Sequence, residues 1–161
     1  MGANREKSQP DGVAVIARNP TAGRDFFILE TIEAGLVLSG AEVKSIRARH
    51  VHLKDSFARI ERGGAVLYHL EISPYPQAGL SAPEPKRPRR LLLHRTQIER
   101  LSARVSQQGM TLIPTKLYFR RGLAKIELGV ARGKKFFDRR EDIRRRETDR
   151  EMQRALKHRI R

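Results

Sequence analysis

The sequence predicts a mainly β fold: a small, closed or nearly closed antiparallel barrel with short helices at its flanks and a basic C-terminal tail. Three observations support this prediction. Short alternating or β-branched runs recur through residues 13–133, two helical patterns interrupt them irregularly, and the apolar pattern fades after residue 133. A doubly wound α/β sheet requires regular alternation of strands and helices, which is missing here. A small barrel fits the order of elements better.

Two strands are predicted after a polar N-terminal arm. Residues 1–12 show no apolar period, so we expect a flexible arm. Residues 13–18 (VAVIAR) and 25–35 (DFFILETIEAG) are rich in the β-branched and aromatic side chains that favour strands. The NPTAG segment between them supplies turn residues. The folded domain should therefore begin at Val13.

A short helix and a hairpin come next. Residues 39–49 adopt a helical apolar period, and Ser39 followed by Glu42 matches a capping box. Within residues 56–73, two alternating runs are joined across Gly63-Gly64. Such a pattern is typical of a β-hairpin.

The second half predicts a loop, a helix and two strands. Residues 74–90 hold five of the eight prolines, so we expect a loop. The periodic run 91–109 ends at a glycine and predicts a helix, centred near 94–108. Residues 110–133 alternate on both sides of Arg121-Gly122, which predicts two paired strands.

The charge of the chain indicates an anionic partner. Thirty-four Lys or Arg against eighteen Asp or Glu give a formal net charge of +16. A nucleic acid suits such an excess because binding its phosphates releases counterions, whereas an anionic membrane surface is the rival. No stretch approaches the roughly 20 apolar residues of a membrane span, and the N-terminus lacks a signal-peptide core. We expect a soluble, unsecreted protein.

The barrel is expected over residues 13–132 and the basic tail over 133–161, which carries twelve Lys or Arg and six Asp or Glu. A helix here would have no apolar residue from 144 to 151, so it could not dock along its length. Ion pairs at helical spacing leave such a helix marginal in water. We predict a tail that is disordered when free and helical on RNA. A solvated tail without function is the alternative.

Further basic residues are candidates for RNA contact. The run PKRPRR, residues 85–90, lies in the predicted loop, where we expect its cationic side chains to be extended and without helical neighbours that neutralise them. Solubility or nuclear targeting is the alternative interpretation, since short basic runs are weak signals. The other candidates are Lys44, Arg47, Arg120, Arg121 and Lys125.

No catalytic motif is apparent. The sequence has no G-x-S-x-G and no G-x-x-x-x-G-K-[ST] motif, and it has no cysteine. None of its five histidines pair at the i, i+4 spacing of a helical metal site. Glu30, Glu33 and Glu42 could bind Mg²⁺ for nuclease chemistry, but lone carboxylates in a basic protein are more often ion-pair partners. We predict a binding module, without metal or cofactor, rather than an enzyme.

Six blocks of the sequence carry a family resemblance. They are FFILETIEAGLVLSGAEVKSIRA, LKDSFARIE, ISPYPQ, RPRRLLLHRTQIERL, TLIPTKLYF and ELGVARGKKFFDRREDIRRRE, in unbroken order from residue 13 to about 160. Together they resemble the SmpB family, the tmRNA-binding proteins of bacterial trans-translation. The resemblance implies an OB-type β-barrel with flanking short helices and a tail that is unstructured in isolation.

The resemblance also implies partners. Members bind the tRNA-like half of tmRNA, help to deliver it to stalled ribosomes, and place their tail in the decoding centre and the empty mRNA path. We therefore expect tmRNA and the ribosome as partners, with alanyl-tmRNA, EF-Tu and GTP in the delivery complex. A bacterial, cytoplasmic protein that is a monomer when free and does not bind membranes is expected.

Particular residues follow from the match. Asn19, Glu33, Leu91 and Lys125 occupy positions that the family links to tmRNA binding, and Asp138-Arg139-Arg140 matches its Asp-Lys-Arg signature. Phe137 stands where members carry a residue able to stack in the decoding centre. The basic residues added to the candidate tmRNA-binding set are Lys44, Arg47, Arg87, Arg89, Arg90 and Arg132. The candidate ribosome-binding set of the tail is Gly133, Lys134, Lys135, Phe137, Asp138, Arg139, Arg140, Ile143 and Arg144.

The segment after Asn19 departs from the family pattern. Pro20 to Arg24 replace its usual basic residues, and Phe26 replaces a Tyr. A resident ribosomal or general RNA-binding protein is the alternative function.

Overall fold

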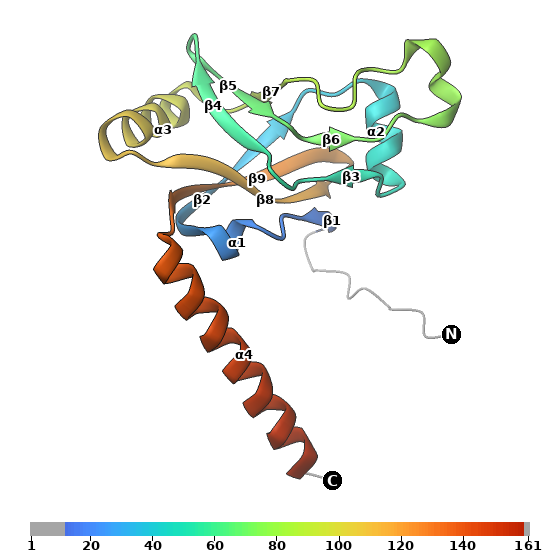
Figure 1. Cartoon of the computed structure of the whole chain (residues 1–161). Coiled ribbons are helices and arrows are strands. Elements are labelled where there is room, and N and C mark those ends of the chain that lie inside the picture. The colour runs from blue at the N-terminus through green and yellow to red at the C-terminus, as the bar shows by residue number, and fades with distance from the viewer. Residues whose placement is uncertain (1–11, 160–161) are drawn as a thin grey trace.

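The computed structural model describes residues 12–159, with the side chains of residues 136–139 and 158–159 outside the description. The arm predicted for residues 1–12 therefore lies outside the described residues, apart from Gly12. Figure 1 shows a compact body of strands and short helices from which one long helix extends. The strands are β1 (Val13–Arg18), β2 (Phe26–Leu36), β3 (Val51–His52), β4 (Phe57–Glu61), β5 (Gly64–Tyr68), β6 (Glu71–Ile72), β7 (Arg89–Leu92), β8 (Thr111–Arg120) and β9 (Leu123–Gly133). The helices are α1 (Ala22–Asp25), α2 (Gly40–Arg47), the 3₁₀ helix η1 (Pro76–Ser81), α3 (Arg95–Gln108) and α4 (Phe136–Arg159).

The antiparallel strands form a closed ring, which confirms the predicted barrel. The ring runs β9-β8-β4-β5-β7-β2 and closes because β9 pairs with both β2 and β8. Strand β1 pairs with residues 116–120 of β8, whereas β3 and β6 form a separate two-stranded sheet. In Figure 1, α2 and α3 lie on opposite sides of the ring.

The hydrophobic core fills the ring because the strands alternate inward and outward side chains. Ile126, Leu128 and Val130 on β9 are fully buried, and each flanking helix contributes a buried anchor, Ile46 from α2 and Leu101 from α3. A smaller cluster lies apart from this core, around Ile113 and Ala131 with Ala22 of α1. Ile113 of this cluster also lines a pocket beside Asn19.

Helix α2 begins as the sequence predicts. Ser39 accepts a hydrogen bond from the Glu42 N–H, and the Glu42 carboxylate accepts one from the Ser39 N–H, which completes the capping box. The same carboxylate also binds Arg87 Nη2 at 2.6 Å and Arg89 Nη2 at 2.8 Å. Arg89 is 1% exposed and donates further hydrogen bonds to the carbonyls of Leu70 and Pro85.

This ion-pair cluster corrects the expectation that the cations of PKRPRR have no neutralising partner. Glu42 of α2 pairs with Arg87 and Arg89, two of the four cations in this segment, and Arg89 is buried. Its contact with RNA stays a prediction. The two arginines lie 45 and 47 residues from their acidic partner, so only the folded chain brings them together.

Three element assignments also need correction. Arg89–Leu92 form strand β7 rather than the end of the loop and the start of a helix, because they pair with β2 and β5. Helix α3 consequently begins at Arg95. The predicted turn after Asn19 contains the four-residue helix α1, and the predicted loop 74–90 contains η1.

Removing the charge of Glu42 should destabilise the fold strongly. Burial alone would raise the pKa of this carboxyl, but the hydrogen bond from Arg87, the Ser39 N–H and the charge of Arg89 outweigh burial and lower it. Glu42→Gln would leave two arginines without their anion, so we expect the free energy of unfolding to fall by about 3 kcal/mol or more. Urea denaturation at neutral pH measures this loss.

The control is Glu99→Gln, which breaks an exposed i, i+4 pair with Arg95 and should cost less than about 0.5 kcal/mol. Because the folded pKa of Glu42 is lowered, its contribution is complete above its ordinary pKa of 4.5 and is lost as the pH falls through the folded value. Equal effects of the two variants would contradict the structural role of Glu42.

Candidate nucleic-acid interface

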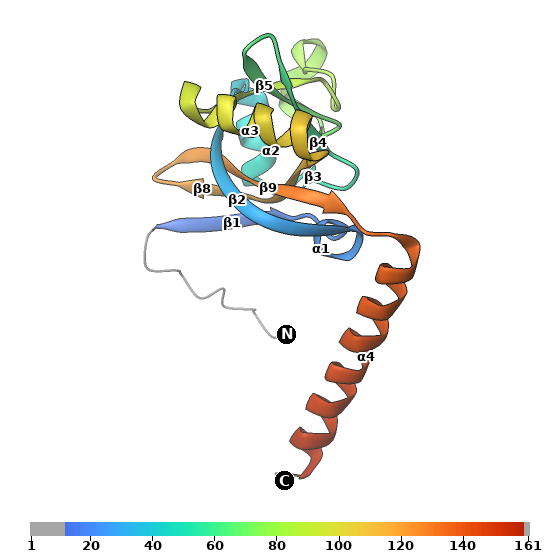
Figure 2. The same cartoon turned by 90° about the vertical axis from the view of Figure 1, so that its left-hand side faces the viewer.

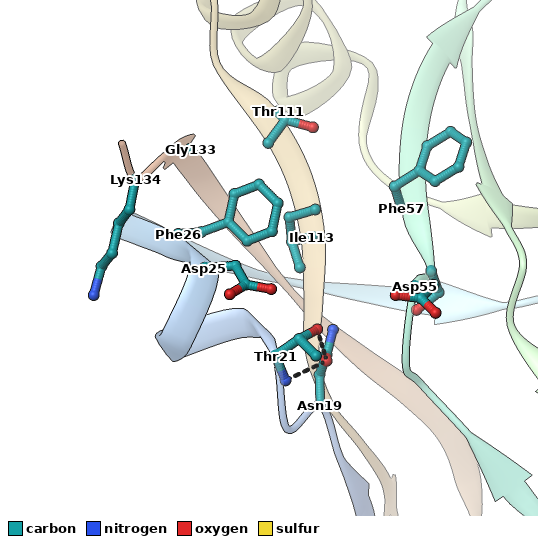
Figure 3. Close-up of a pocket in the computed structure, with 11 residues that line it drawn as sticks. Asn19, Thr21, Asp25, Phe26, Asp55, Phe57, Thr111, Ile113, Gly133 and Lys134 are labelled. Carbon is teal, nitrogen blue, oxygen red and sulfur yellow. Dashed lines mark hydrogen bonds between the residues drawn. The ribbon is translucent and has the colours of Figure 1, made fainter. Parts of the chain in front are cut away.

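Asn19 fixes the turn between β1 and β2. Its Nδ2 donates to the Pro114 carbonyl at 2.8 Å, and its Oδ1 accepts from the N–H and hydroxyl of Thr21 at 3.0 and 2.9 Å. The acceptor carbonyl is available because β8 has an irregular register between Pro114 and Lys116. Figure 3 shows the Asn19–Thr21 hydrogen bonds at the edge of a pocket. Asn19 is buried and positions this turn, and its contact with RNA stays a prediction.

Glu33 lies at the centre of a charged cluster on the outside of the ring. It binds Arg120 Nη1 at 2.7 Å and lies 3.9 Å from Lys125 Nζ, and it accepts a hydrogen bond from the Tyr118 hydroxyl. The cluster forms because Tyr118 pairs with Lys125 across β8 and β9, while Gly35 pairs with Lys125 across β2 and β9. Burial, followed by the hydrogen bond to Glu33, raises the pKa of Tyr118, so the phenol stays a donor. The cluster combines two cations, one anion and an aromatic side chain on one surface.

The sequence predicts most of this cluster but not Tyr118. Glu33 and Lys125 are candidates through the family resemblance, and Arg120 is a candidate through its charge. Tyr118 and Arg120 are two residues apart on β8, so the strand alternation was the signal that could have linked them.

The other candidate RNA-binding residues separate into exposed and buried ones. Lys44 lies 5.5 Å from the centre of the Tyr75 ring, and Arg47 lies 5.2 Å from that of Phe119, so both exposed cations are placed against aromatic faces. Leu91 is 2% exposed and belongs to the core, and its contact with RNA stays a prediction. The candidates that are exposed or partly exposed are Glu33, Lys44, Arg47, Arg87, Arg90, Lys125 and Arg132.

Lys134 anchors α4 to the barrel. Its Nζ donates to the Gly23 carbonyl at 3.2 Å, forms an ion pair with Asp142, and lies 4.8 Å from the centre of the Phe27 ring. Arg146 adds a hydrogen bond of 2.8 Å to the same Gly23 carbonyl. The hydrogen bond from Lys134 is the leading cause that lowers the pKa of Asp142. Lys134, predicted to serve the ribosome, is thus buried at the base of the tail.

Helix α4 and the residues just before it carry the rest of the predicted ribosome-binding set. It leaves the body near α1 and extends away from it in both views (Figures 1 and 2). Lys135, Arg140, Ile143 and Arg144 are exposed, whereas the side chains of residues 136–139, including Phe137, Asp138 and Arg139, lie outside the description. Gly133 ends β9 just before the helix. The helical form matches the form predicted on RNA; disorder of the free tail stays a prediction.

The described part of the chain contains no candidate membrane span and no candidate metal cluster. No helix in residues 12–159 is long and apolar enough to cross a membrane. Among the same residues, no cluster of three or more His, Asp or Glu is arranged to hold a metal ion. Glu30, one of the carboxylates considered for Mg²⁺, instead pairs with Arg100 and Arg104 of α3.

Comparison with known proteins identifies the family. The family model described as SmpB protein matches residues 16–158, which include the barrel and nearly all of α4. The chain belongs to the SmpB family. An SsrA-binding protein of Caldanaerobacter subterraneus subsp. tengcongensis is 52% identical over 96% of this chain and 96% of the relative. Another, from Geobacillus kaustophilus, is 54% identical over 90% of this chain and 94% of the relative.

A solved structure supports the same assignment. It is described as "tmRNA-SmpB: a journey to the center of the bacterial ribosome" and is 49% identical in sequence, with a TM-score of 0.63. The match covers 74% of this chain and 85% of that chain. The SmpB-family resemblance and the fold inferred from sequence are therefore confirmed.

Replacing Lys134 should release α4 from the barrel. Lys134→Ala removes the contacts with Gly23, Asp142 and Phe27, so we expect faster motion of α4 on the nanosecond timescale, while the barrel stays folded. Backbone ¹⁵N relaxation measures this change. Lys135→Ala is the matched control, since this neighbouring lysine is exposed. Identical relaxation in both variants would mean that Lys134 does not hold the helix.

Proposed function

We propose that this protein is an RNA-binding adaptor of trans-translation. In this role the barrel binds the tRNA-like domain of tmRNA, and the tail occupies the decoding centre and the empty mRNA path of a stalled ribosome. The observation that carries the proposal is the SmpB family match over residues 16–158, because it spans both the barrel and the tail. A solved tmRNA-SmpB structure at 49% identity supports it.

The surface of the barrel suits a folded RNA. Lys44, Arg47, Arg90 and Arg132 offer cations for phosphates, and the Glu33 cluster offers a carboxylate beside two cations. A carboxylate can accept from base amino groups, so this cluster supplies selectivity that a purely cationic surface lacks. The A-form shape and single-stranded loops of a tRNA-like domain are suitable targets for such a mixed surface.

The tail suits a long anionic channel. Helix α4 spans 24 residues, and its described side chains are exposed apart from the half-buried Asp142. Its exposed apolar residues Ile143, Met152 and Leu156 do not form one continuous stripe at helical spacing, which disfavours membrane insertion. A cationic helix with exposed side chains on all sides fits a path lined by RNA.

The proposal also includes the partners of the delivery complex and the cellular location. We assign alanyl-tmRNA, EF-Tu and GTP as further partners, with the protein acting as a monomer in the bacterial cytoplasm and without catalysis of its own. These assignments rest on the family rather than on a contact seen in this chain.

Removal of the tail should leave tmRNA recognition intact. We expect a version ending at Lys135, which preserves β9 and its pairing with β2, to bind the tRNA-like half of tmRNA within a few-fold of the full chain. Its affinity should depend somewhat less steeply on salt, because the cationic helix is absent. Titrations at two salt concentrations with ordinary tRNA as competitor measure both quantities. Loss of selectivity over tRNA would contradict recognition by the barrel.

Tail substitutions should separate the two steps of the function. Asp138→Ala combined with Arg139→Ala and Arg140→Ala is expected to spare tmRNA affinity and abolish tagging of stalled nascent chains. The measurements are the same titration and a reconstituted tagging assay. Glu147→Ala with Thr148→Ala and Asp149→Ala, farther along the same helix, is a control for helix disruption. Equal loss of binding and tagging in the first variant would refute the division of labour.

A further inference from the structure

A cavity of about 500 Å³ lies beside the Asn19 turn, and its lining includes Gly133 and Lys134 at the base of α4. Phe26 from the start of β2 and Phe57 from the start of β4 lie on opposite sides of Ile113 on β8 (Figure 3). Asp55 and Thr111 add polar groups to the lining. We propose that this pocket binds one unpaired nucleobase of an RNA partner, with a preference for guanine. The inference deepens the RNA-binding function proposed above and rests on it.

Neighbouring rings hold the Phe57 side chain in place in the unbound protein. The Phe57 ring stacks on Tyr68 with centroids 5.5 Å apart, and the ring of His69 meets it edge-on at 5.3 Å. Phe26 and Phe57 both pack against the small cluster that contains Ile113, yet each remains partly exposed. A base that enters therefore meets ordered apolar surface, which reduces the conformational entropy lost on binding.

Most polar groups of the pocket are paired, Asp25 with Arg24 among them. In residues 12–159, no hydrogen bond joins the Asp55 carboxylate or the Thr111 hydroxyl to another group, although Arg24 lies close enough for its charge to interact with that of Asp55. Asp55 has φ +61°, the left-handed region, and the following Ser56 is held by its hydroxyl, which donates to the Leu53 carbonyl at 2.5 Å. Aspartate is one of the side chains that adopt this region most readily, and here it does so in a turn.

The chemistry of the carboxylate favours guanine. Two carboxylate oxygens accept hydrogen bonds side by side, and guanine presents adjacent N1–H and N2–H donors on its Watson–Crick edge. Adenine and cytosine present one amino group beside a ring acceptor, and uracil presents one N–H between two carbonyls. Each of these bases would bring an acceptor against the Asp55 carboxylate, so guanine fits this pocket best.

The charges around the pocket favour a base inside and its phosphates outside. Asp25 and Asp55 both line the pocket and would repel a phosphate that entered it. Lys54 and Lys135, neighbours in sequence of the pocket residues Asp55 and Lys134, are exposed at the surface. An unstacked nucleotide could thus place its base on the aromatic walls and its phosphates near these lysines.

Short oligonucleotides test the proposal separately from tmRNA. Full-length protein is titrated with four oligouridylates that are identical except for a central G, A, C or U. We expect the G-containing strand to bind on the order of tenfold more tightly than the others. In the NMR spectrum, the Ile113 methyl resonances should then shift through the ring current of the bound base. Equal affinity for all four strands would overturn the proposal.

The matched variants are Asp55→Asn and Asp149→Asn, which remove the same charge from the pocket and from the exposed face of α4. Asp55→Asn should abolish the preference for G and leave the affinity for the all-U strand unchanged, whereas Asp149→Asn should retain the preference. A preference that survives Asp55→Asn would overturn the assignment of the pocket. Absence of guanine preference, together with tight binding of the tRNA-like half of tmRNA, would overturn the pocket alone and leave the proposed function standing.

Discussion

The structure depends above all on the double pairing of β9. This strand pairs along its length with both β2 and β8, and these two ladders close the ring. They also bring Glu33, Tyr118 and Lys125 to one surface, although the residues come from three strands. The same strand ends at Gly133, so it sets the point at which α4 leaves the barrel. Closure of the sheet, the charged surface and the exit of the tail are therefore consequences of one strand.

The positive charge of the chain is divided between structural and available cations. Arg87 and Arg89 neutralise Glu42, and Lys134 pairs with Asp142 at the base of α4. Much of the remaining excess lies on the barrel surface and along α4, where its interaction with phosphate is screened by salt and strengthened by counterion release. Net charge alone thus overstates the charge available to a partner, and burial decides which cations are available. Arg89 is buried against Glu42, whereas Arg90, its neighbour on the opposite face of β7, is exposed.

The sequence predicted those features that depend on local patterns. The capping box of Ser39 and Glu42, the β4–β5 hairpin and the helix ending at Gly109 all follow from spacing and turn chemistry. The hairpin turn itself lies at Arg62-Gly63, one residue before the predicted Gly63-Gly64. Features set by partners distant in sequence were missed. Strand β7 was not recognised because RRLLL has no period of its own, and the Asn19 acceptor is 95 residues away. Site residues could be identified by type and family position, but burial separated Leu91 and Arg89 from the exposed candidates.

The Glu42 carboxylate has an evolutionary consequence. It caps α2 and neutralises two arginines at once, so a mutation at any of these three positions leaves the others with unsatisfied hydrogen bonds or charge. Replacement of Glu42 or Arg89 should be selected against most strongly, because both side chains are buried. Residues 42, 87 and 89 are therefore expected to be retained together among homologous sequences.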